Sequence, residues 1–299
     1  MQLLDRLARG EALVCDGAMG TMLIERGLKP GECPEQWNLE RPEVLVDIAR
    51  QYVDAGADIV ETNTFGGSPL KLAQYGLEAQ TEEINRLAIR AARQGASGQA
   101  LIAASCGPTG RILIPYGDTE PGEVSAAFRR QFAALLGEGI DALVVETMTD
   151  LSEATLAVKA ARELAPDLPV IATMTFDSTS RGFFTIMGVT VEQAARGLSD
   201  AGTDIVGSNC GNGIDNMVKI ASEFRKHTHM PIIIQSNAGL PRFESGRAVY
   251  AETPEFMAAH VRNLLECGVS IIGGCCGTTP EHIAAIRREL DKIKPGKRP

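Results

Sequence analysis

The feature that most restricts the fold of this chain is an eightfold repetition of one local pattern. In each repeat, a short run rich in β-branched residues ends in a polar cluster with Gly or Asn, and an amphipathic helical stretch follows. The repeats are spaced by roughly 30 to 45 residues, the length of a βα unit. The predicted strands lie at residues 12–17, 58–65, 100–107, 141–148, 169–176, 204–211, 231–239 and 269–277.

Strands that are almost continuously apolar and alternate with helices predict a parallel sheet covered on both faces. Eight such units favour a single (β/α)8 TIM barrel, an α/β fold. The alternative is an open, doubly wound sheet, but "DGAMGTM" after the first strand lacks the glycine spacing of a dinucleotide cradle. We expect the barrel over residues 1–290 and a basic tail or linker stump over residues 291–299.

The charge and cysteine content exclude several classes of partner. The chain has a formal net charge of −9, and its lysines and arginines are scattered, which argues against nucleic acid or an anionic membrane as a partner. No apolar run is long enough to span a bilayer. Seven cysteines without an export signal indicate a reducing compartment, so we expect a cytoplasmic protein.

Polar side chains stand at nearly every predicted strand end, which is where TIM barrels carry their chemistry. A sequence that specified only a barrel would not need them, so the pattern favours an enzyme. These residues are Asp16, Glu61, Thr62, Asn63, Ser105, Cys106, Glu146, Thr147, Thr175, Asp177, Asn209, Cys210, Ser236, Asn237, Cys275 and Cys276.

Three cysteines at the ends of the sixth and eighth strands fit a catalytic zinc site. Three thiolates would leave the fourth tetrahedral position open, and the glycines around the vicinal pair allow both thiols to turn toward one metal. A vicinal disulfide and simple core packing are the alternatives. The candidate ligands are Cys210, Cys275 and Cys276, whereas Cys15, Cys33, Cys106 and Cys267 are predicted to be small core residues.

Six motifs in order, from about residue 10 to 290, give the chain a resemblance to a known family. The chain resembles the homocysteine S-methyltransferases, and above all the homocysteine-binding barrel of cobalamin-dependent methionine synthase. The motifs are "DGAMGTML" (16–23), "ETNTFG" (61–66), "CGPTG" (106–110), "NCG" (209–211), "SNAGLP" (236–241) and "GGCCGTTPEH" (273–282).

The resemblance implies zinc-dependent transfer of a methyl group to the thiolate of L-homocysteine, which forms methionine. It assigns one Zn²⁺ per chain to Cys210, Cys275 and Cys276. It assigns the substrate amino group to Asp16, Glu146 and Asn237, and the substrate carboxylate to backbone N–H groups of Ala18, Met19 and Gly20. Thr62 and Asn63, together with Glu61, would either line the pocket or support the barrel mouth. Thr278 and Thr279 are expected to cap the last helix.

The methyl donor differs among members of this family, which use methylcobalamin on a protein, S-methylmethionine, S-adenosylmethionine or betaine. Betaine is disfavoured because a quaternary ammonium calls for aromatic rings, whereas this chain has 5% aromatics and Thr147 where betaine enzymes carry an aromatic. Trp37 is more typical of a packing residue. We expect methylcobalamin on a separate corrinoid protein, and the segment 177–190 is a candidate contact for that partner.

Two alternatives for the function stay open at the level of the sequence. The barrel could methylate another thiol or a selenol, since only the contacts to the amino group separate homocysteine from similar compounds. It could also store or sense zinc or thiol amino acids, although a sensor would not need an open side for a donor.

Overall fold

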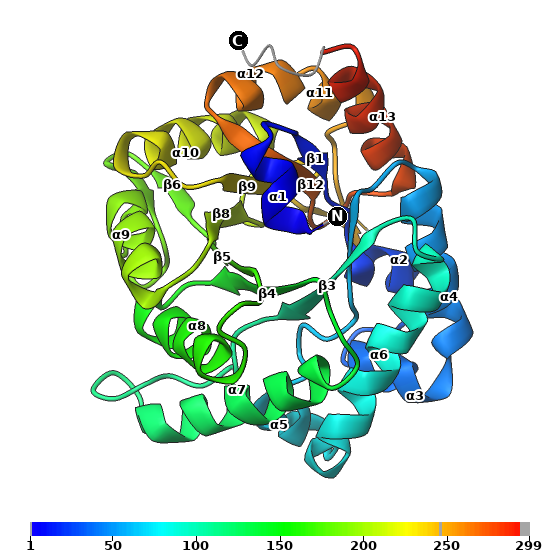
Figure 1. The fold of residues 1–299 in the computed structure, drawn as a ribbon, viewed down its shortest axis with the longest axis vertical. Coiled ribbons are helices and arrows are strands. Elements are labelled where there is room, and N and C mark those ends of the chain that lie inside the picture. The colour runs from blue at the N-terminus through cyan, green and yellow to red at the C-terminus, as the bar shows by residue number, and fades with distance from the viewer. Residues whose placement is uncertain (1, 245–246, 294–299) are drawn as a thin grey trace.

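Eight parallel strands form one barrel, which confirms the predicted TIM fold (Figure 1). The computed structural model describes residues 2–244 and 247–293. The barrel strands are β1 (Leu13–Val14), β2 (Ile59–Glu61), β3 (Leu101–Cys106), β4 (Ala142–Met148), β5 (Val170–Met174), β8 (Ile205–Asn209), β9 (Ile232–Ser236) and β12 (Val269–Gly274).

The barrel closes between its first two strands through a short contact. The other neighbours follow the order β1-β12-β9-β8-β5-β4-β3-β2 with parallel ladders. Between β1 and β2 the only ladder contact in the described chain is a parallel bridge between Cys15 and Ile59. The Asp16 N–H donates to the Ile59 carbonyl at 3.0 Å, and the Asp58 N–H donates to the Val14 carbonyl at 2.7 Å. These bonds form a narrow seam between β1 and β2.

A ring of helices surrounds the strands, and each amphipathic stretch places its apolar side on the sheet. The amphipathic stretch over residues 253–268 forms two helices, α11 and α12, with Ala259 and His260 between them. The helices are α1 (Leu3–Ala8), α2 (Met19–Glu25), α3 (Trp37–Glu40), α4 (Pro42–Asp54), α5 (Pro69–Leu72), α6 (Thr81–Ala96), α7 (Pro121–Leu136), α8 (Leu151–Leu164), α9 (Val191–Ala201), α10 (Ile214–His227), α11 (Pro254–Ala258), α12 (Val261–Glu266) and α13 (Pro280–Asp291), with 3-10 turns at Pro34–Gln36, Ala73–Tyr75 and Glu78–Gln80.

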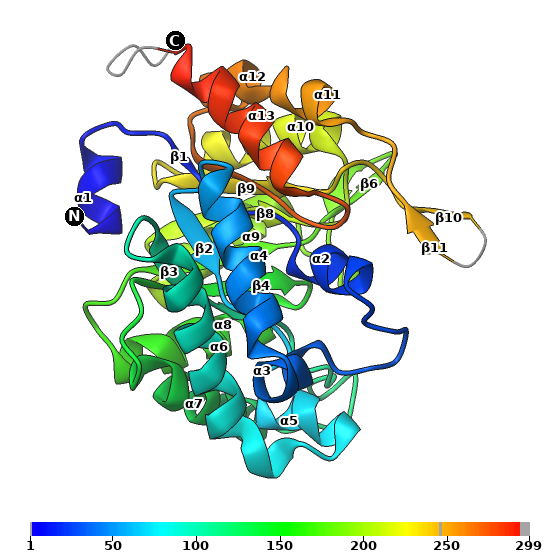
Figure 2. The same ribbon diagram turned by 90° about the vertical axis from the view of Figure 1, so that its right-hand side faces the viewer.

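Helix α1 covers the amino-terminal end of the barrel. Leu3 and Leu7 of this helix pack on the inward-facing residues at the start of the strands, among them Leu13, Ile59 and Ile271. Figure 2 shows α1 on one side of the molecule and the β10–β11 hairpin on the opposite side. The carboxyl ends of the strands therefore face away from α1.

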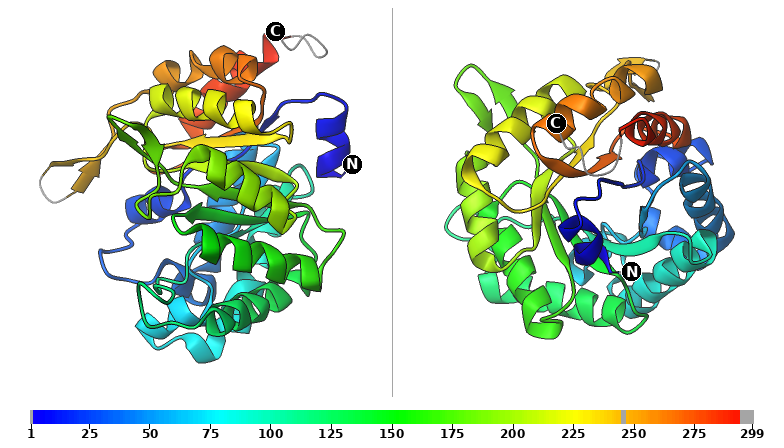
Figure 3. Two further views of the ribbon diagram at one scale, coloured as in Figure 1. Left: turned by 90° about the vertical axis from the view of Figure 1, so that its left-hand side faces the viewer. Right: turned by 45° about the horizontal axis from the view of Figure 1, so that its top comes forward.

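Two β-hairpins extend from loops that follow barrel strands (Figures 2 and 3). The first, β6 (Asp177–Thr179) with β7 (Gly182–Phe184), occupies the segment expected to be an irregular contact loop. Phe183, which looks exposed in the sequence, is half-buried and packs against the main core. The second hairpin, β10 (Arg242–Glu244) with β11 (Arg247–Val249), was not predicted.

The last helix ends one residue beyond residue 290, where the barrel domain was expected to end. Helix α13 continues to Asp291, and Ile293 packs against the core. Residues 294–299 of the predicted tail lie outside the described residues. None of the helices in the described part of the chain is both long and apolar enough to cross a membrane.

Candidate active site

Three thiols meet at the carboxyl end of the barrel, as the sequence predicts. The Sγ atoms of Cys210, Cys275 and Cys276 all lie within 4.8 Å of one another. Cys210 follows β8, and the vicinal pair follows β12, which ends at Gly274. All seven cysteines of the chain are free thiols, so the alternative of a vicinal disulfide is not what the structure contains.

The backbone turns sharply at both cysteine loops, which brings the thiols together. Cys210 has a φ of 60° and Gly211 a φ of 72°, an arrangement that a residue with a Cβ seldom adopts. Both loops are tied to β9, since the Cys210 N–H donates to the Gln235 carbonyl (3.1 Å) and the Cys275 N–H to the Ser236 carbonyl (2.7 Å). Strand β9 thus sets the spacing of the two loops on its two sides.

The pKa values of the three thiols differ. Hydrogen bonds from Cys275 and Cys276 lower the pKa of Cys210 to about 3. The same interactions with Cys210 raise the pKa of Cys276 to about 11 and that of Cys275 well above its usual value. A thiolate at Cys210 that accepts from two neighbouring thiols would attract a cation.

The geometry of the three thiols fits zinc. With Zn–S bonds of about 2.3 Å, tetrahedral ligands are separated by about 3.8 Å. The Sγ atoms of Cys210 and Cys276 are 3.8 Å apart. Three sulfur donors that approach from one side, without a fourth cysteine in the cluster, match a zinc site with one open position.

Three carboxyl groups lie beside the thiols inside the barrel mouth. They are Asp16 after β1, Glu61 at the end of β2 and Glu146 in β4. The Glu61 N–H donates to Asp16 Oδ2 at 2.8 Å, and Gln235 Nε2 donates to Glu61 Oε1 at 2.9 Å. The Ser105 hydroxyl donates to Glu146 Oε1. Among the described residues, no arginine, lysine or histidine forms a salt bridge with any of these carboxyl groups.

Burial without a cation holds these carboxyl groups toward their neutral forms. Desolvation raises the pKa of Asp16 to about 8 and that of Glu146 to about 7. Desolvation, followed by the charges of Glu146 and Asp16, raises the pKa of Glu61 well above its usual value. A ligand that carried an ammonium group into this cluster would stabilise the ionised carboxylates.

We predict a pH-dependent stability difference between the Asp16→Asn variant and the unmodified protein. The pKa of Asp16 rises from an ordinary 3.8 to about 8 on folding, so its favourable contribution is complete below pH 4 and is lost as the pH rises toward 8. Asparagine stays neutral and keeps an acceptor for the Glu61 N–H. The Tm of the variant minus that of the unmodified protein should therefore increase by several degrees between pH 5 and pH 8 in thermal unfolding. A difference independent of pH would contradict a neutral, buried Asp16.

Asn209 joins the carboxyl cluster to the thiol cluster. Its Nδ2 donates to Glu146 Oε2 at 3.0 Å and lies 3.9 Å from Cys275 Sγ. Its Oδ1 accepts from the Thr147 N–H and the Thr173 hydroxyl, both at 2.8 Å. A bulge in β4 and a φ of 58° at Thr147 turn Glu146 toward this amide. One buried amide thus fixes the relative positions of both clusters.

The remaining predicted substrate-binding residues lie in two places, Asn237 beside the thiols and the others at the start of α2. Asn237 lies with the thiols, where its side chain hydrogen-bonds Cys210, and its Oδ1 has no partner among the described groups. The Ala18 N–H is already paired with the Thr278 hydroxyl at 3.1 Å. Met19 and Gly20 are the first two residues of α2, where backbone N–H groups have no intrahelical acceptor.

Thr62 and Asn63 support the barrel mouth through bonds to the protein itself. The Thr62 hydroxyl pairs with that of Thr64 at 2.6 Å and accepts from the Ser105 N–H at 3.2 Å. The Asn63 amide donates to the Pro34 carbonyl (2.8 Å) and to Asn38 (2.9 Å). Thr62 and Asn63 were expected either to line the pocket or to support the barrel mouth, and the contacts seen in the structure are of the supporting kind.

Four further residues that the sequence analysis singled out have structural contacts of several kinds. Cys106 points to Gln131 at 3.2 Å, away from the three thiols. Trp37 is buried beneath the Arg41 guanidinium, in keeping with a packing role. Thr279 is the N-cap of α13 as expected, but Thr278 is not a cap: its hydroxyl donates to the Cys275 carbonyl at 2.8 Å. Thr278 thus holds the turn that carries the vicinal cysteines.

Two side chains that lie at the site were not predicted to be there. Gln235 is a residue of β9 whose side chain contacts both Glu61 and Cys15, and its Oε1 has no partner among the described groups. Tyr250 follows β11, and its hydroxyl donates to Cys276. A glutamine directly after three isoleucines of a buried strand was a signal for the first, whereas nothing local marked the second.

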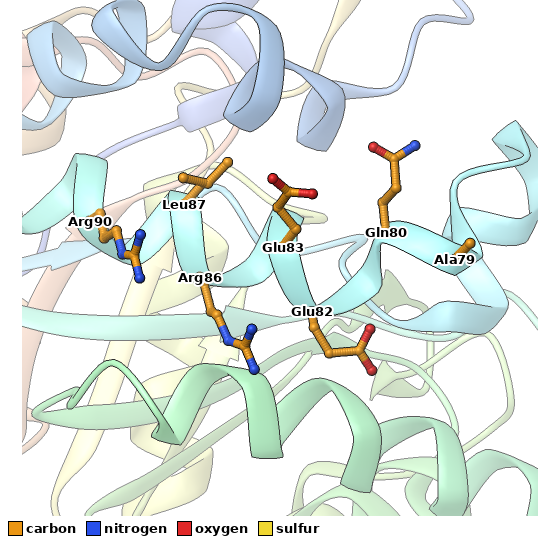
Figure 4. A pocket seen from close by; sticks show the side chains of 7 residues that line it. All are labelled: Ala79, Gln80, Glu82, Glu83, Arg86, Leu87 and Arg90. Carbon is orange, nitrogen blue, oxygen red and sulfur yellow. The ribbon is translucent and has the colours of Figure 1, made fainter.

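A surface groove elsewhere on the molecule is unrelated to these clusters. It lies along α6 on the outer ring and is lined by charged side chains that include Glu82, Glu83 and Arg86 (Figure 4). Glu82 pairs with Arg130 at 2.6 Å. None of the thiols or buried carboxyl groups lines this groove.

Comparison with known proteins agrees with the fold. The sequence profile of the family described as homocysteine S-methyltransferase matches residues 13–290. The methionine synthase of Mycobacterium leprae (strain TN) is 33% identical over 313 residues, which cover 98% of this chain and 25% of that protein. That of Mycobacterium tuberculosis (strain ATCC 25618 / H37Rv) is 33% identical over 311 residues, with 98% and 26% covered. The chain therefore spans about a quarter of the length of these relatives.

Solved structures of one enzyme share the whole fold. The metallated form of the homocysteine methyltransferase MmuM from Escherichia coli superposes with a TM-score of 0.80 at 24% identity, covering 96% of this chain and 99% of that chain. Its oxidized form gives a TM-score of 0.77 at 25% identity, with 96% and 97% covered. The profile match over nearly the whole barrel and the identity to the methionine synthases together show that this chain belongs to the homocysteine S-methyltransferase family.

Proposed function

We propose that this protein transfers a methyl group to the sulfur of L-homocysteine and so forms methionine, with zinc held by Cys210, Cys275 and Cys276. The observation that carries the proposal is the junction of two clusters. A group of three thiols that fits a thiophilic metal lies directly beside buried carboxyl groups that lack a cation. Homocysteine carries a thiol and an ammonium group on one short chain, so it can satisfy both clusters at once.

The chemistry of the transfer requires a deprotonated sulfur. Zinc, when bound by the three cysteines, supplies a positive charge that favours the thiolate of the substrate at neutral pH. The sulfur gains the methyl group, and the donor leaves with the electron pair of the broken bond. The chain's own part is to hold the thiolate and the amino acid end of the substrate in one orientation, which reduces the entropic cost of the reaction.

The carboxyl cluster would bind the substrate ammonium. Asp16 and Glu146 are the proposed partners, and Glu61 and Gln235 stand next to them with an unused amide oxygen on Gln235. Asn209 keeps Glu146 in place by a 3.0 Å hydrogen bond. Charge-assisted hydrogen bonds of this kind contribute about 1.5–3 kcal/mol each.

The first turn of α2 would bind the substrate carboxylate. Met19 and Gly20 lead that turn with backbone N–H groups that have no intrahelical acceptors, and these groups favour an anion. Because the Ala18 N–H already donates to Thr278, we propose the N–H groups of the two later residues as the main contacts of the carboxylate.

For the methyl donor, we propose methylcobalamin carried by a separate corrinoid protein. The support is the 33% identity to methionine synthases over almost the whole chain. The burial of the Trp37 ring under Arg41 is a further reason to disfavour betaine. A reducing, cytoplasmic setting is part of this proposal, in keeping with seven free thiols.

A donor screen tests the proposed function. Zinc-loaded protein is incubated with homocysteine and, in separate reactions, with methylcobalamin, S-methylmethionine, S-adenosylmethionine or betaine, and methionine is measured by mass spectrometry. We expect methionine with methylcobalamin and background levels with betaine. Turnover with betaine, or with a sulfonium donor alone, would overturn the donor assignment. Absence of methionine with every donor would overturn the function itself.

A further inference from the structure

The two loops that carry the thiols come from strands that are not neighbours. Cys210 follows β8 and the vicinal pair follows β12, with β9 between them. Strand β9 anchors the base of each loop, so the separation of the thiols also depends on the segment that connects the two loops above β9. One short segment beyond the β10–β11 hairpin, residues 250–252, contacts both loops.

On the side of Cys210, the contact is made by the Glu252 carboxylate. Its Oε2 accepts from the Ile214 N–H at 3.0 Å, and Ile214 begins α10 four positions after Cys210. The carboxylate is packed so closely against Gly213 that a Cβ there would overlap Oε1. A negative charge at this point also complements the positive end of α10. Glu252 thus holds the end of the Cys210 loop.

On the side of the vicinal cysteines, the same residue is held through its backbone. The Glu252 N–H donates to the Ala238 carbonyl at 2.9 Å, and the Ala238 N–H donates to the Cys276 carbonyl at 3.0 Å. The Glu252 carbonyl pairs with His282 Nε2 at 3.1 Å, which ties it to the first turn of α13. One residue is therefore bonded toward both thiol loops.

Tyr250 reinforces the connection to the vicinal cysteines. Its ring lies against Gly277, where a Cβ would overlap ring atoms, and the φ of Gly277 is 81°. Its hydroxyl donates to the Cys276 sulfur. The 250–252 segment therefore contacts the Cys276 loop through the Tyr250 side chain and is linked to it by backbone bonds through Ala238, while it reaches the Cys210 loop through Glu252.

We infer that Glu252 is a positioning residue for the metal centre, because it links the Cys210 loop to the Cys275–Cys276 loop and so fixes the distance between their thiols. Glu252 does not join the thiol cluster itself. Residues that orient metal ligands without touching the metal commonly change metal affinity 10- to 100-fold when they are replaced. The inference rests on the proposed zinc site.

The test is the zinc affinity of the Glu252→Ala variant, measured by competition with a chromophoric chelator under conditions where the protein is folded. We expect zinc binding about 10- to 100-fold weaker than in the unmodified protein. The Glu252→Gln variant keeps an acceptor for the Ile214 N–H, so it should bind zinc within about threefold of the unmodified protein. Glu255→Ala, an exposed acidic position in the first turn of α11, is the matched control and should leave the affinity unchanged.

Thermal unfolding with and without zinc separates positioning from general stability. A purely structural role would lower the Tm of the zinc-free and zinc-loaded Glu252→Ala protein equally. If Glu252 positions the thiols, zinc should raise the Tm of Glu252→Ala by less than it raises the Tm of the unmodified protein. The increase in Tm reports the zinc affinity of the folded state. An unchanged zinc affinity in Glu252→Ala would overturn the inference alone, whereas a failure of the unmodified protein to bind zinc would overturn the proposed metal site.

Discussion

Alanine at Cys210, Cys275 or Cys276 is expected to abolish both zinc retention and methionine formation. Four-ligand zinc sites bind with about 10–16 kcal/mol, so the loss of one ligand removes roughly 3–4 kcal/mol, or two to three powers of ten in affinity. The three Sγ atoms lie within 4.8 Å of one another, and each would supply one of only three protein ligands. Zinc content after dialysis, measured by inductively coupled plasma mass spectrometry, is the direct readout.

Cys267→Ala is the matched control for these variants. Its thiol is half-buried at the end of α12 and points to the Val218 carbonyl at 3.7 Å, away from the cluster. This variant should retain one zinc per chain and full activity. Stoichiometric zinc in all three ligand variants would rule out the assignment, and loss of zinc from the Cys267 variant would point to general instability instead.

The second large effect is expected at the carboxyl cluster. In Asp16→Asn and in Glu146→Gln, the KM for homocysteine should rise about 10- to 150-fold, because each change removes a charge-assisted hydrogen bond to the substrate ammonium worth about 1.5–3 kcal/mol. The zinc content should stay at that of the unmodified protein, since neither side chain belongs to the cluster of Cys210, Cys275 and Cys276.

A substrate analogue without the amino group tests whether the lost contact is the one to the substrate ammonium. The unmodified protein should prefer homocysteine over 4-mercaptobutanoate, which has the same thiol and carboxylate, whereas both variants should lose most of that preference. Glu153→Gln is a suitable control, because Glu153 is also a buried carboxyl group but accepts from the Thr109 N–H and hydroxyl outside the cluster. An unchanged preference in Asp16→Asn and Glu146→Gln would show that the ammonium binds elsewhere.

The expected behaviour of Asp16 shows a conflict between stability and function. A neutral asparagine should be tolerated better than aspartate by the ligand-free protein at pH 8, because burial raises the pKa of Asp16 to about 8. The same change is expected to weaken substrate binding. Active sites often retain such unfavourable groups because the ligand, and not the fold, satisfies them.

The barrel and the thiol cluster could be predicted from the sequence because both rest on local patterns. Each βα unit is marked by its own apolar run and helical periodicity, and the fold follows from their number. The vicinal cysteines after Gly273 and Gly274 indicate that the strand has ended, which the structure confirms at Gly274. These features are local, whereas the meeting of Cys210 with the vicinal pair follows from the barrel, which places the carboxyl ends of all its strands at one rim.

The directions of side chains at the strand ends could not be predicted in the same way. Thr62 and Asn63 look equivalent to Glu61 in the motif, yet their polar groups bond to Ser105 and Pro34 while Glu61 joins the carboxyl cluster. The β10–β11 hairpin is short and polar, so its strands carry no clear alternation. The contacts of Glu252 join residues 38 positions apart, and no local pattern encodes them.

The seam between β1 and β2 gives the substrate a second role. One bridge between Cys15 and Ile59 joins these strands, and the carboxyl groups of Asp16 and Glu61 stand on its two sides. A ligand whose ammonium group contacts both would add its binding free energy to the closure of the barrel. Local opening of the fold at this point would then require release of the ligand, so that occupancy of the site and integrity of the barrel become a single equilibrium.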